Sequence, residues 1–192
     1  EVCQSFCVDN GAFSAWKSGK PFDIEGYAKF ISEWHKHPAF DWYAIPDVID
    51  GTEQDNRVMR AAWRNHCPEG AWNKGVPVWH MHESLEELQY LALAYERVAI
   101  GSSGEYATIG NEEWWNRISD AMDAICDEDG RPKCKLHGMR MLDPTVFSHI
   151  PFSSADSTNV ARNIGIDSAW TGTYIPKSNE ARAMVMMERI ES

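Results

Sequence analysis

Apolar runs of strand type alternate along the chain with segments of helical pattern. Seven short runs rich in aliphatic and aromatic residues each end in a polar or glycine-rich stretch. They are SFCV (5–8), DWYAIPDVI (41–49), VPVWHMH (76–82), RVAIG (97–101), KCKLHGM (133–139), FSSAD (152–156) and GTYI (172–175). Because strands that alternate with helices usually pair in parallel, the pattern predicts an α/β fold built on a parallel sheet.

Four of the intervening segments begin with a residue whose side-chain oxygen suits the N-cap of a helix. These are Thr52 before EQDNRVMRAAW, Ser84 ahead of LQYLALAY, Asn111 before EEWWNRISDAMDAI, and Asp143 before Pro144. Ser84 and Glu87 also have the spacing of a capping box, and proline is well suited to the first helical position. We therefore expect a helix in each of these connections.

The number of strands favours a TIM-type (β/α) barrel that occupies residues 1–192 as a single domain. A full eight-stranded barrel takes about 250 residues, so the barrel is expected to be small or incomplete. The chain opens directly on a strand at VCQSFCV (2–8), which suggests that the first barrel strand is missing or that closure is partial. An open, doubly wound parallel sheet is the alternative architecture.

Charge and hydropathy narrow the classes of function. The net charge is −11 and the pI is about 5.0, so a nucleic-acid role requires a local basic patch. No run of 18 apolar residues and no basic-then-apolar leader is present, which predicts a soluble, cytoplasmic protein without membrane contact. The five cysteines form no CxxC motif, so we expect them to be reduced and mostly buried.

Polar residues follow six successive apolar runs, where parallel folds place their active sites. Each has a structural interpretation as a turn, a helix cap or a core histidine, but their recurrence at strand ends predicts one shared site. The candidates are Asp9, Asp47, His80, His82, Gly101, Ser102, Ser103, Gly104, His137 and Asp156. Three carboxylates around one pocket suit cleavage of a glycosidic bond, because one can attack carbon while another transfers a proton.

Cofactor chemistry has weaker support. The stretch AIGSSGEY (99–106) is rich in small residues that let a planar ligand or an anion approach the backbone, but it lacks the spacing of a dinucleotide or Walker motif. His80 and His82 would face the same side of a strand and could bind a metal, yet no third ligand is evident. We therefore predict no cofactor and no metal.

The strand-end motifs, taken in order, resemble those of the tRNA-guanine transglycosylase superfamily. They are VDNGAFSAW, IPDVID, VPVWHMHES, VAIGSSGEY, KCKLHGM and FSSADST, and they span nearly the whole chain. The closer similarity is to small bacteriophage-type members related to enzymes that insert 7-deazaguanine bases into DNA. The resemblance implies a TIM-type barrel, a cytoplasmic location in the host, and base exchange through a covalent intermediate.

The resemblance also implies roles for individual residues. Asp156 matches the carboxylate that attacks C1′ of the sugar, and Asp9 matches the general acid/base. Asp47 matches the residue that reads the purine edge, Gly101 and its neighbours match the loop that contacts the base, and Phe13 matches an aromatic residue near the base. His80, His82 and His137 complete the expected base-binding set.

Several departures from the family pattern shape the expected partners. No glutamine stands near His80 and His82, where the tRNA enzymes read the base, and the Cys/His zinc motif and the basic tRNA-docking surface are absent from the sequence. The expected substrates are a purine or 7-deazapurine base and a nucleic acid, DNA rather than tRNA, or a nucleoside. A homodimer or a partner protein that presents the substrate is compatible with this interpretation.

Two other functions stay open at this point. An N-glycosidase acting on nucleosides or nucleotides would use water in place of the incoming base. A non-catalytic purine-binding protein would keep the fold without the chemistry. The first would release free base, and the second would bind it unchanged.

Overall fold

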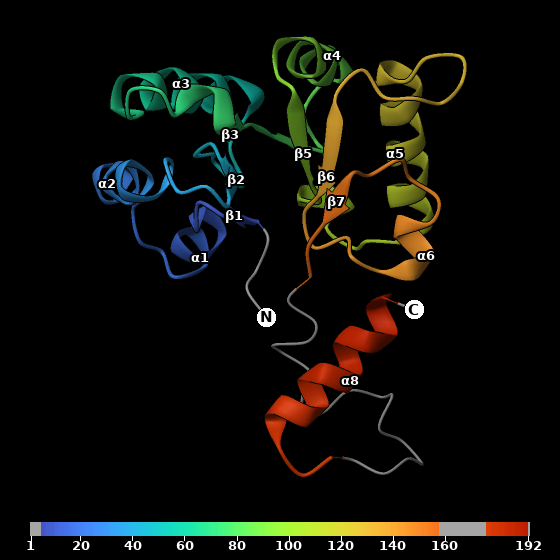
Figure 1. Ribbon diagram of the computed structural model, residues 1–192. Helices are drawn as coiled ribbons and strands as arrows, with labels where there is room; N and C mark the ends of the chain where they lie inside the picture. The colour runs from blue at the N-terminus through green and yellow to red at the C-terminus, as the bar shows by residue number, and fades with distance from the viewer. Residues whose placement is uncertain (1–4, 158–175, 192) are drawn as a thin grey trace.

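The computed structural model describes residues 5–157 and 176–191. Its parallel strands are β1 (Phe6–Val8), β2 (Phe40–Ala44), β3 (Gly75–Val76), β4 (Val78–His80), β5 (Arg97–Gly101), β6 (Lys135–Gly138) and β7 (Ser154–Ala155). Its helices are α1 (Ala12–Lys17), α2 (Ile24–Trp34), α3 (Glu53–His66), α4 (Leu85–Ala94), α5 (Glu112–Ile125), α6 (Pro144–Phe147) and α8 (Asn179–Glu191), with short 3₁₀ turns at η1 (Trp72–Lys74) and η2 (Gly104–Tyr106). Figure 1 shows their arrangement. The predicted α/β fold with parallel strands is confirmed.

The strands pair in chain order within two sheets, β1-β2-β3 and β4-β5-β6-β7. Only Pro77 separates β3 from β4, and proline lacks the N–H that a continuous ladder needs. The Pro77 carbonyl still accepts a hydrogen bond from the Ala99 N–H at 2.9 Å. The single strand expected at 76–82 is therefore divided into β3 and β4, but the chain keeps its position between β2 and β5. The order shows none of the reversal that defines a doubly wound sheet.

The strand array is strongly curved. The ring of Trp42 on β2 lies 4.7 Å from that of His137 on β6, and the Arg97 guanidinium on β5 lies 5.3 Å from the Trp42 ring. In a flat sheet β2 and β6 would be roughly 14 Å apart, since neighbouring strands are about 4.8 Å apart. Side chains of non-adjacent strands therefore meet across the concave side.

No closed barrel is present among the described residues, where β1 and β7 each pair on one side only. The predicted seventh run, GTYI at 172–175, lies outside them. The described part of the chain supplies six strand positions, whereas about eight are needed for the strands to close around a filled interior. The structure thus establishes a curved parallel array with an open edge at each end.

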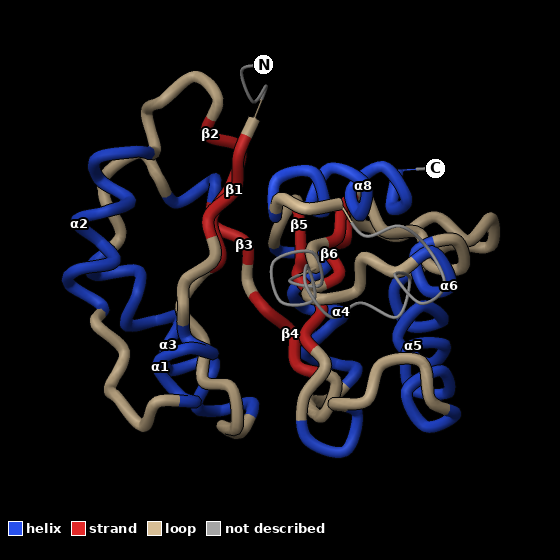
Figure 2. The backbone as a smooth tube through the Cα atoms, turned by 90° about the horizontal axis from the view of Figure 1, so that it is seen from below, coloured by secondary structure: helices blue, strands red, loops and turns tan. Residues whose placement is uncertain are grey.

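Alternation along the strands divides the core into an outer and an inner part. On β2, Tyr43 and Ile45 pack outward with α2 and α3, whereas Trp42 and Ala44 face the concave side. A second outer core joins β4, β5 and β6 to α4 and α5. Figure 2 shows these two groups of helices on either side of the strands. The small inner cluster leaves room for polar side chains at the strand ends.

The predicted helix starts are confirmed, because N-capping depends on residues close in sequence. Side-chain oxygens of Thr52, Ser84, Asn111 and Asp143 each accept a backbone N–H of the following turn. Only one hydrogen bond of the capping box predicted at Ser84 is formed, the one from the Glu87 N–H to the Ser84 hydroxyl. The Ser84 N–H bonds to Glu53 of α3 instead of Glu87, because Glu87 is turned into the core.

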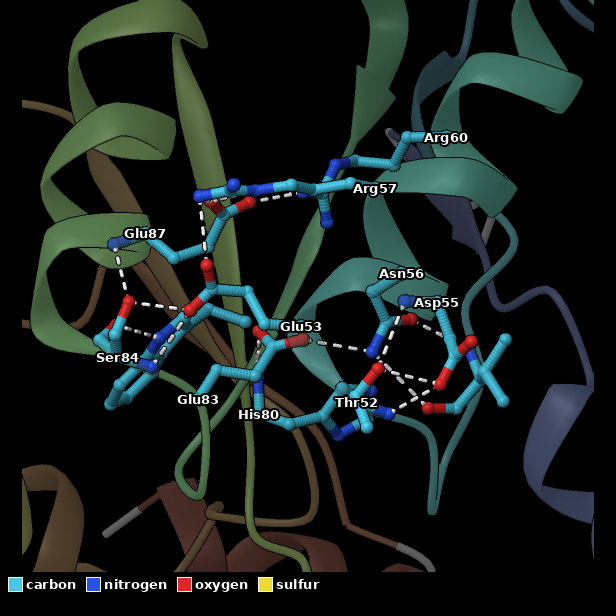
Figure 3. Close-up of polar contacts among 12 residues, drawn as sticks. Thr52, Glu53, Asp55, Asn56, Arg57, Arg60, His80, Glu83, Ser84 and Glu87 are labelled. Carbon is cyan, nitrogen blue, oxygen red and sulfur yellow. Dashed lines mark hydrogen bonds and ion pairs between the residues drawn. The ribbon is translucent and has the colours of Figure 1, made fainter.

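Glu87 joins α4 to α3 through a buried ion pair (Figure 3). Its side chain is 0% exposed and contacts the guanidinium groups of Arg57, at 2.6 Å, and Arg60. The Arg60 side chain is itself only 10% exposed. Removal of either charge would leave the other buried and without its counter-ion.

Glu87→Ala is expected to lower the free energy of unfolding by roughly 3–5 kcal/mol, the usual cost of breaking a buried pair on one side. Chemical denaturation monitored by circular dichroism measures the change. The neighbouring Glu86→Ala, in the same first turn but exposed, is the matched control and should cost well under 1 kcal/mol. Equal losses in the two variants would contradict this role for Glu87.

Some expectations from the sequence need correction. Three helices, α1, α2 and α8, lie outside the predicted set. Among the described cysteines, which are all free, only Cys134 is buried, whereas Cys67 and Cys126 are partly exposed and Cys7 is exposed. Within the described ranges, no helix is both long and apolar enough to cross a bilayer.

Candidate functional site

The predicted site residues lie at the carboxyl ends of the parallel strands. Asp9 directly follows β1, His80 ends β4, Gly101 ends β5, and Asp156 directly follows β7. Parallel strands deliver these ends to one side of the array, and α1 and α6 lie on that side as well (Figure 1). The fold thus brings the predicted residues to a common face.

Asp156 is held by two hydrogen bonds to a single carboxylate oxygen. Its Oδ1 accepts from the backbone N–H of Arg140 at 2.9 Å and lies 3.2 Å from Nε2 of His137. Its own N–H donates to the Gly138 carbonyl at 3.2 Å, which fixes the backbone. The side chain is 47% exposed, so the second oxygen keeps access to the space beyond the strands.

His137 supports this carboxylate from β6. Its Nδ1 lies 2.9 Å from the Ser154 hydroxyl, and the edge of its ring packs against Trp42. The ring is buried, so these contacts fix which nitrogen faces Asp156. His137 was predicted to bind the base, and that role stays a prediction; the geometry directs Nε2 to the carboxylate.

Asp156 favours the ionised state. Burial would raise the pKa of its carboxyl group, but the hydrogen bonds from His137 and from the Arg140 backbone, together with nearby positive charge, lower it further than burial raises it. The resulting pKa is below the ordinary value of an aspartate. Asp156 is thus a positioned carboxylate whose side chain is about half exposed.

Asp9 is shifted in the opposite direction. Desolvation by the surrounding protein, which disfavours the charged form, is the main cause of its raised pKa, and the negative charges of Asp47 and Asp156 add to the effect. Backbone N–H groups of Asn10 and Gly11 offset part of it. The side chain retains solvent access, so protonation can respond to what binds beside it. Two carboxyl groups at one face therefore have opposed protonation preferences.

Asp47 is buried and uses both carboxylate oxygens. Oδ1 accepts from Nδ2 of Asn10 at 2.7 Å, and Oδ2 lies 2.8 Å from Nε2 of His80. Asn10 also donates to the Ile45 carbonyl and accepts the N–H of Ala12, so it connects the ends of β1 and β2 to α1. Asp47 therefore organises its neighbours, and its predicted contact with the base stays untested.

His80 has one ring nitrogen without a partner. Nε2 faces Asp47, whereas Nδ1 is buried and makes no hydrogen bond to the described residues. A methyl group placed on Gly101 would come within 3.3 Å of this Nδ1, so a side chain at position 101 would crowd the nitrogen. Buried polar atoms are usually paired, and an unpaired one beside a glycine indicates a place for a ligand or a water molecule.

Glu83 fixes the backbone of His80, as Figure 3 shows. Its carboxylate accepts the His80 N–H at 3.1 Å and the Asn56 side-chain N–H at 2.8 Å. Burial raises the pKa of Glu83, although these hydrogen bonds partly oppose the shift. Glu83 is a supporting residue that the strand-end pattern did not indicate, because it lies in the turn that leads to α4.

His82 hydrogen-bonds to two loops, and its predicted contact with the base stays a prediction. Its Nδ1 lies 2.8 Å from the Ser103 hydroxyl, and its Nε2 lies 2.9 Å from the Gly51 carbonyl. Both ring nitrogens are thus occupied, which leaves neither for a metal. Across the described ranges, no three His, Cys, Asp or Glu side chains are grouped as a metal would require.

The loop after β5 keeps its small residues in defined places. The Ser102 hydroxyl accepts from the Trp114 indole N–H at 2.9 Å, and the Ser103 hydroxyl pairs with His82. Gly104 has φ +58°, in the left-handed region that glycine adopts without strain. The serine side chains are therefore used internally, and the backbone of the loop is what a ligand would meet.

Arg140 is the most informative residue that the sequence prediction omitted. It has φ +60°, an unusual conformation for a residue other than glycine, and this places its N–H on Asp156. Its guanidinium donates to the Ser102 carbonyl at 3.0 Å and lies 4.8 Å from the Phe13 ring. The sequence signal for Arg140 was its position directly after the apolar run KCKLHGM, where site residues were expected.

No protein-family model, curated protein or solved structure matches the chain. The geometry of the strand-end site and the sequence motifs are therefore the observations that bear on function.

Proposed function

We propose that the protein is a nucleobase transglycosylase that replaces a purine in DNA with guanine or a 7-deazaguanine, through a covalent intermediate between an aspartate and the sugar. The observation that carries the proposal is that a hydrogen-bonded Asp156 with a lowered pKa shares the strand-end face with Asp9, whose pKa is raised. Glycosidic chemistry needs one carboxylate and one carboxylic acid at a single site.

In the proposed reaction, a carboxylate oxygen of Asp156 attacks C1′ and forms a C–O bond as the C–N bond to the purine breaks. The departing base takes the proton of Asp9, which becomes a carboxylate. The incoming base then gives a proton to Asp9 and attacks C1′, and the bond to Asp156 breaks. Atoms and charge balance over the cycle, and no cofactor or metal is required.

The base is proposed to bind between the loop 101–104 and the strand ends. The Nδ1 of His80, which has no hydrogen-bond partner among the described residues, would pair with a polar edge of the purine, and the glycine at 101 would allow the ring to approach. Asp47 and Asn10 would hold this wall in place. Phe13, 37% exposed at the start of α1, would cover one face of the base.

The proposed architecture is an incomplete TIM-type barrel, in which the described strands curve toward closure but leave β1 and β7 unpaired with each other. Its support is the contact of β2 with β6 and the influence of the Asp156 charge on Asp9. These two residues follow strands at opposite ends of the array, which in a flat sheet would lie roughly 24 Å apart. At that distance the charge would be largely screened.

Incubation with labelled guanine or 7-deazaguanine and DNA tests the function directly. The expected result is incorporation of label together with release of unlabelled base in equal amount. Release without incorporation would assign the site to an N-glycosidase. The half-exposed side chain of Asp156 would let water reach the reacting carbon in that case. Absence of both, on DNA and on a free nucleoside, would overturn the proposal.

A further inference from the structure

Two large aromatic side chains on α1 remain exposed beside the site. Phe13 is 37% exposed and Trp16 is 48% exposed, and their ring centroids lie 5.6 Å apart. The spacing of three residues puts both on one face of the helix. On the other side, the guanidinium of Arg140 lies 4.8 Å from the Phe13 ring. Two rings and one cation thus form a continuous exposed edge.

The same segment is locally basic in an acidic protein. Residues 10–22 contain Lys17 and Lys20 and no aspartate or glutamate, whereas the whole chain carries a net charge of −11. Arg140 adds a third positive charge at the edge of this segment. The patch has the charge that a polyanion needs, and it lies beside the strand-end site.

An open groove of about 410 Å³ runs along α1 and begins at Asn10, the residue after Asp9. Ser14, Ser18 and Lys20 line it with hydroxyl and ammonium groups. Asp23 also lines the groove, but its carboxylate accepts the Gly26 N–H at the start of α2. The groove therefore offers donors for a phosphate backbone between α1 and the start of α2, on a different face of α1 from Phe13 and Trp16.

We propose that Trp16 and Arg140, together with Lys17 and Lys20, bind the single-stranded DNA that flanks the reacting nucleotide, beside the base that Phe13 covers. Exposed rings stack on unpaired bases regardless of sequence, and interleaved cations contact their phosphates. A free nucleoside would occupy only the strand-end site and would need no such surface. The inference rests on the proposed function and specifies its substrate as an unpaired DNA segment.

Arg140 connects this surface to the nucleophile. Its backbone N–H holds Asp156 while its guanidinium covers Phe13. A strand stacked on the aromatic edge would therefore have its next nucleotide directed toward the carboxylate. We expect longer substrates to bind more tightly than a single nucleoside for this reason.

Binding of a fluorescein-labelled 12-residue oligodeoxythymidine, followed by anisotropy, tests the surface without any catalytic step. Trp16→Ala is expected to weaken binding roughly tenfold, which matches the loss of one stacked base, and Trp16→Phe should largely restore it. Lys20→Ala should weaken binding and reduce the slope of log affinity against log salt by about 0.7.

Matched controls are Trp34→Ala, which removes an indole that is 41% exposed on α2, and Lys36→Ala, which removes an exposed lysine after that helix. Both should leave DNA binding unchanged. Failure of the wild-type protein to bind, or equal effects of Trp16→Ala and Trp34→Ala, would overturn the proposal. Tighter binding of the matching RNA strand would overturn the assignment to DNA.

Exchange assays separate this inference from the proposed function. Trp16→Ala should lower kcat/KM for a 12-residue DNA that carries one guanine among thymines by about tenfold and leave the value for free deoxyguanosine unchanged. Exchange that proceeds equally well in Trp16→Ala on both substrates would remove the DNA surface but keep the transglycosylase. DNA binding that depends on Trp16, without any base exchange, would keep the DNA surface but remove the transglycosylase.

Discussion

Replacement of Asp156 by asparagine is expected to reduce base exchange by about 10⁴-fold or more, the scale of loss when a nucleophile is removed. The amide preserves the size of the side chain and can still accept the Arg140 N–H. It is a poor nucleophile, so no covalent sugar intermediate can form at a useful rate. Single-turnover kinetics on DNA measures the loss, and equilibrium dialysis measures binding of the free base, which should be retained.

Asp50→Asn is the matched control, because it removes an exposed carboxylate near the same strand ends. It should exchange bases at the wild-type rate. Exchange by Asp156→Asn within tenfold of the wild type would exclude the nucleophile role. Equal loss of base binding and exchange would show that Asp156 is structural, and thermal unfolding of both variants separates that case.

Asp9→Asn is expected to lower kcat by about 10²–10⁴-fold, the usual contribution of general acid catalysis. An amide cannot supply the proton that the departing purine needs. The wild-type rate should fall at low pH as Asp156 becomes protonated below its lowered pKa, and at high pH as Asp9 loses its proton above its raised pKa. In Asp9→Asn the loss of rate at high pH should disappear while the acidic limb stays.

The same variant should have the opposite effect on stability. A carboxyl group whose pKa is raised by folding is less favourable when charged in the folded state, so it lowers stability at pH values above both its pKa values. Asp9→Asn should therefore raise Tm at neutral pH, and the gain should vanish in acid, where Asp9 is protonated in both states. A fall in Tm at neutral pH would contradict the raised pKa.

Local features of this fold could be predicted from the sequence because they depend on neighbouring residues. The N-caps at Thr52, Ser84, Asn111 and Asp143 are set by contacts within one turn. Alternation of apolar and polar residues identified the strands, and the polar residue after each strand indicated the face of the site. α1 was missed because Gly11, in a left-handed conformation, stands at its N-cap without a capping side chain.

Features set by tertiary contacts could not be predicted in this way. The link from Asn10 to Asp47 spans 37 positions, and the link from Arg140 to Ser102 spans 38. Glu87 satisfies the spacing of a capping box, yet two arginines from α3 draw its charge into the core. The length of the strand array also depends on long-range pairing, so the barrel expected from repeated βα units is an open array in the described chain.

The central claim is that Asp156 becomes bonded to C1′ of a nucleotide. Intact-mass spectrometry of the protein, quenched in acid after incubation with a 12-residue DNA in the absence of free base, tests it most directly. The account predicts a species heavier by the DNA less one purine, located on Asp156 by peptide mapping and absent in Asp156→Asn. Efficient base exchange with no such species, or an adduct on another residue, would contradict it.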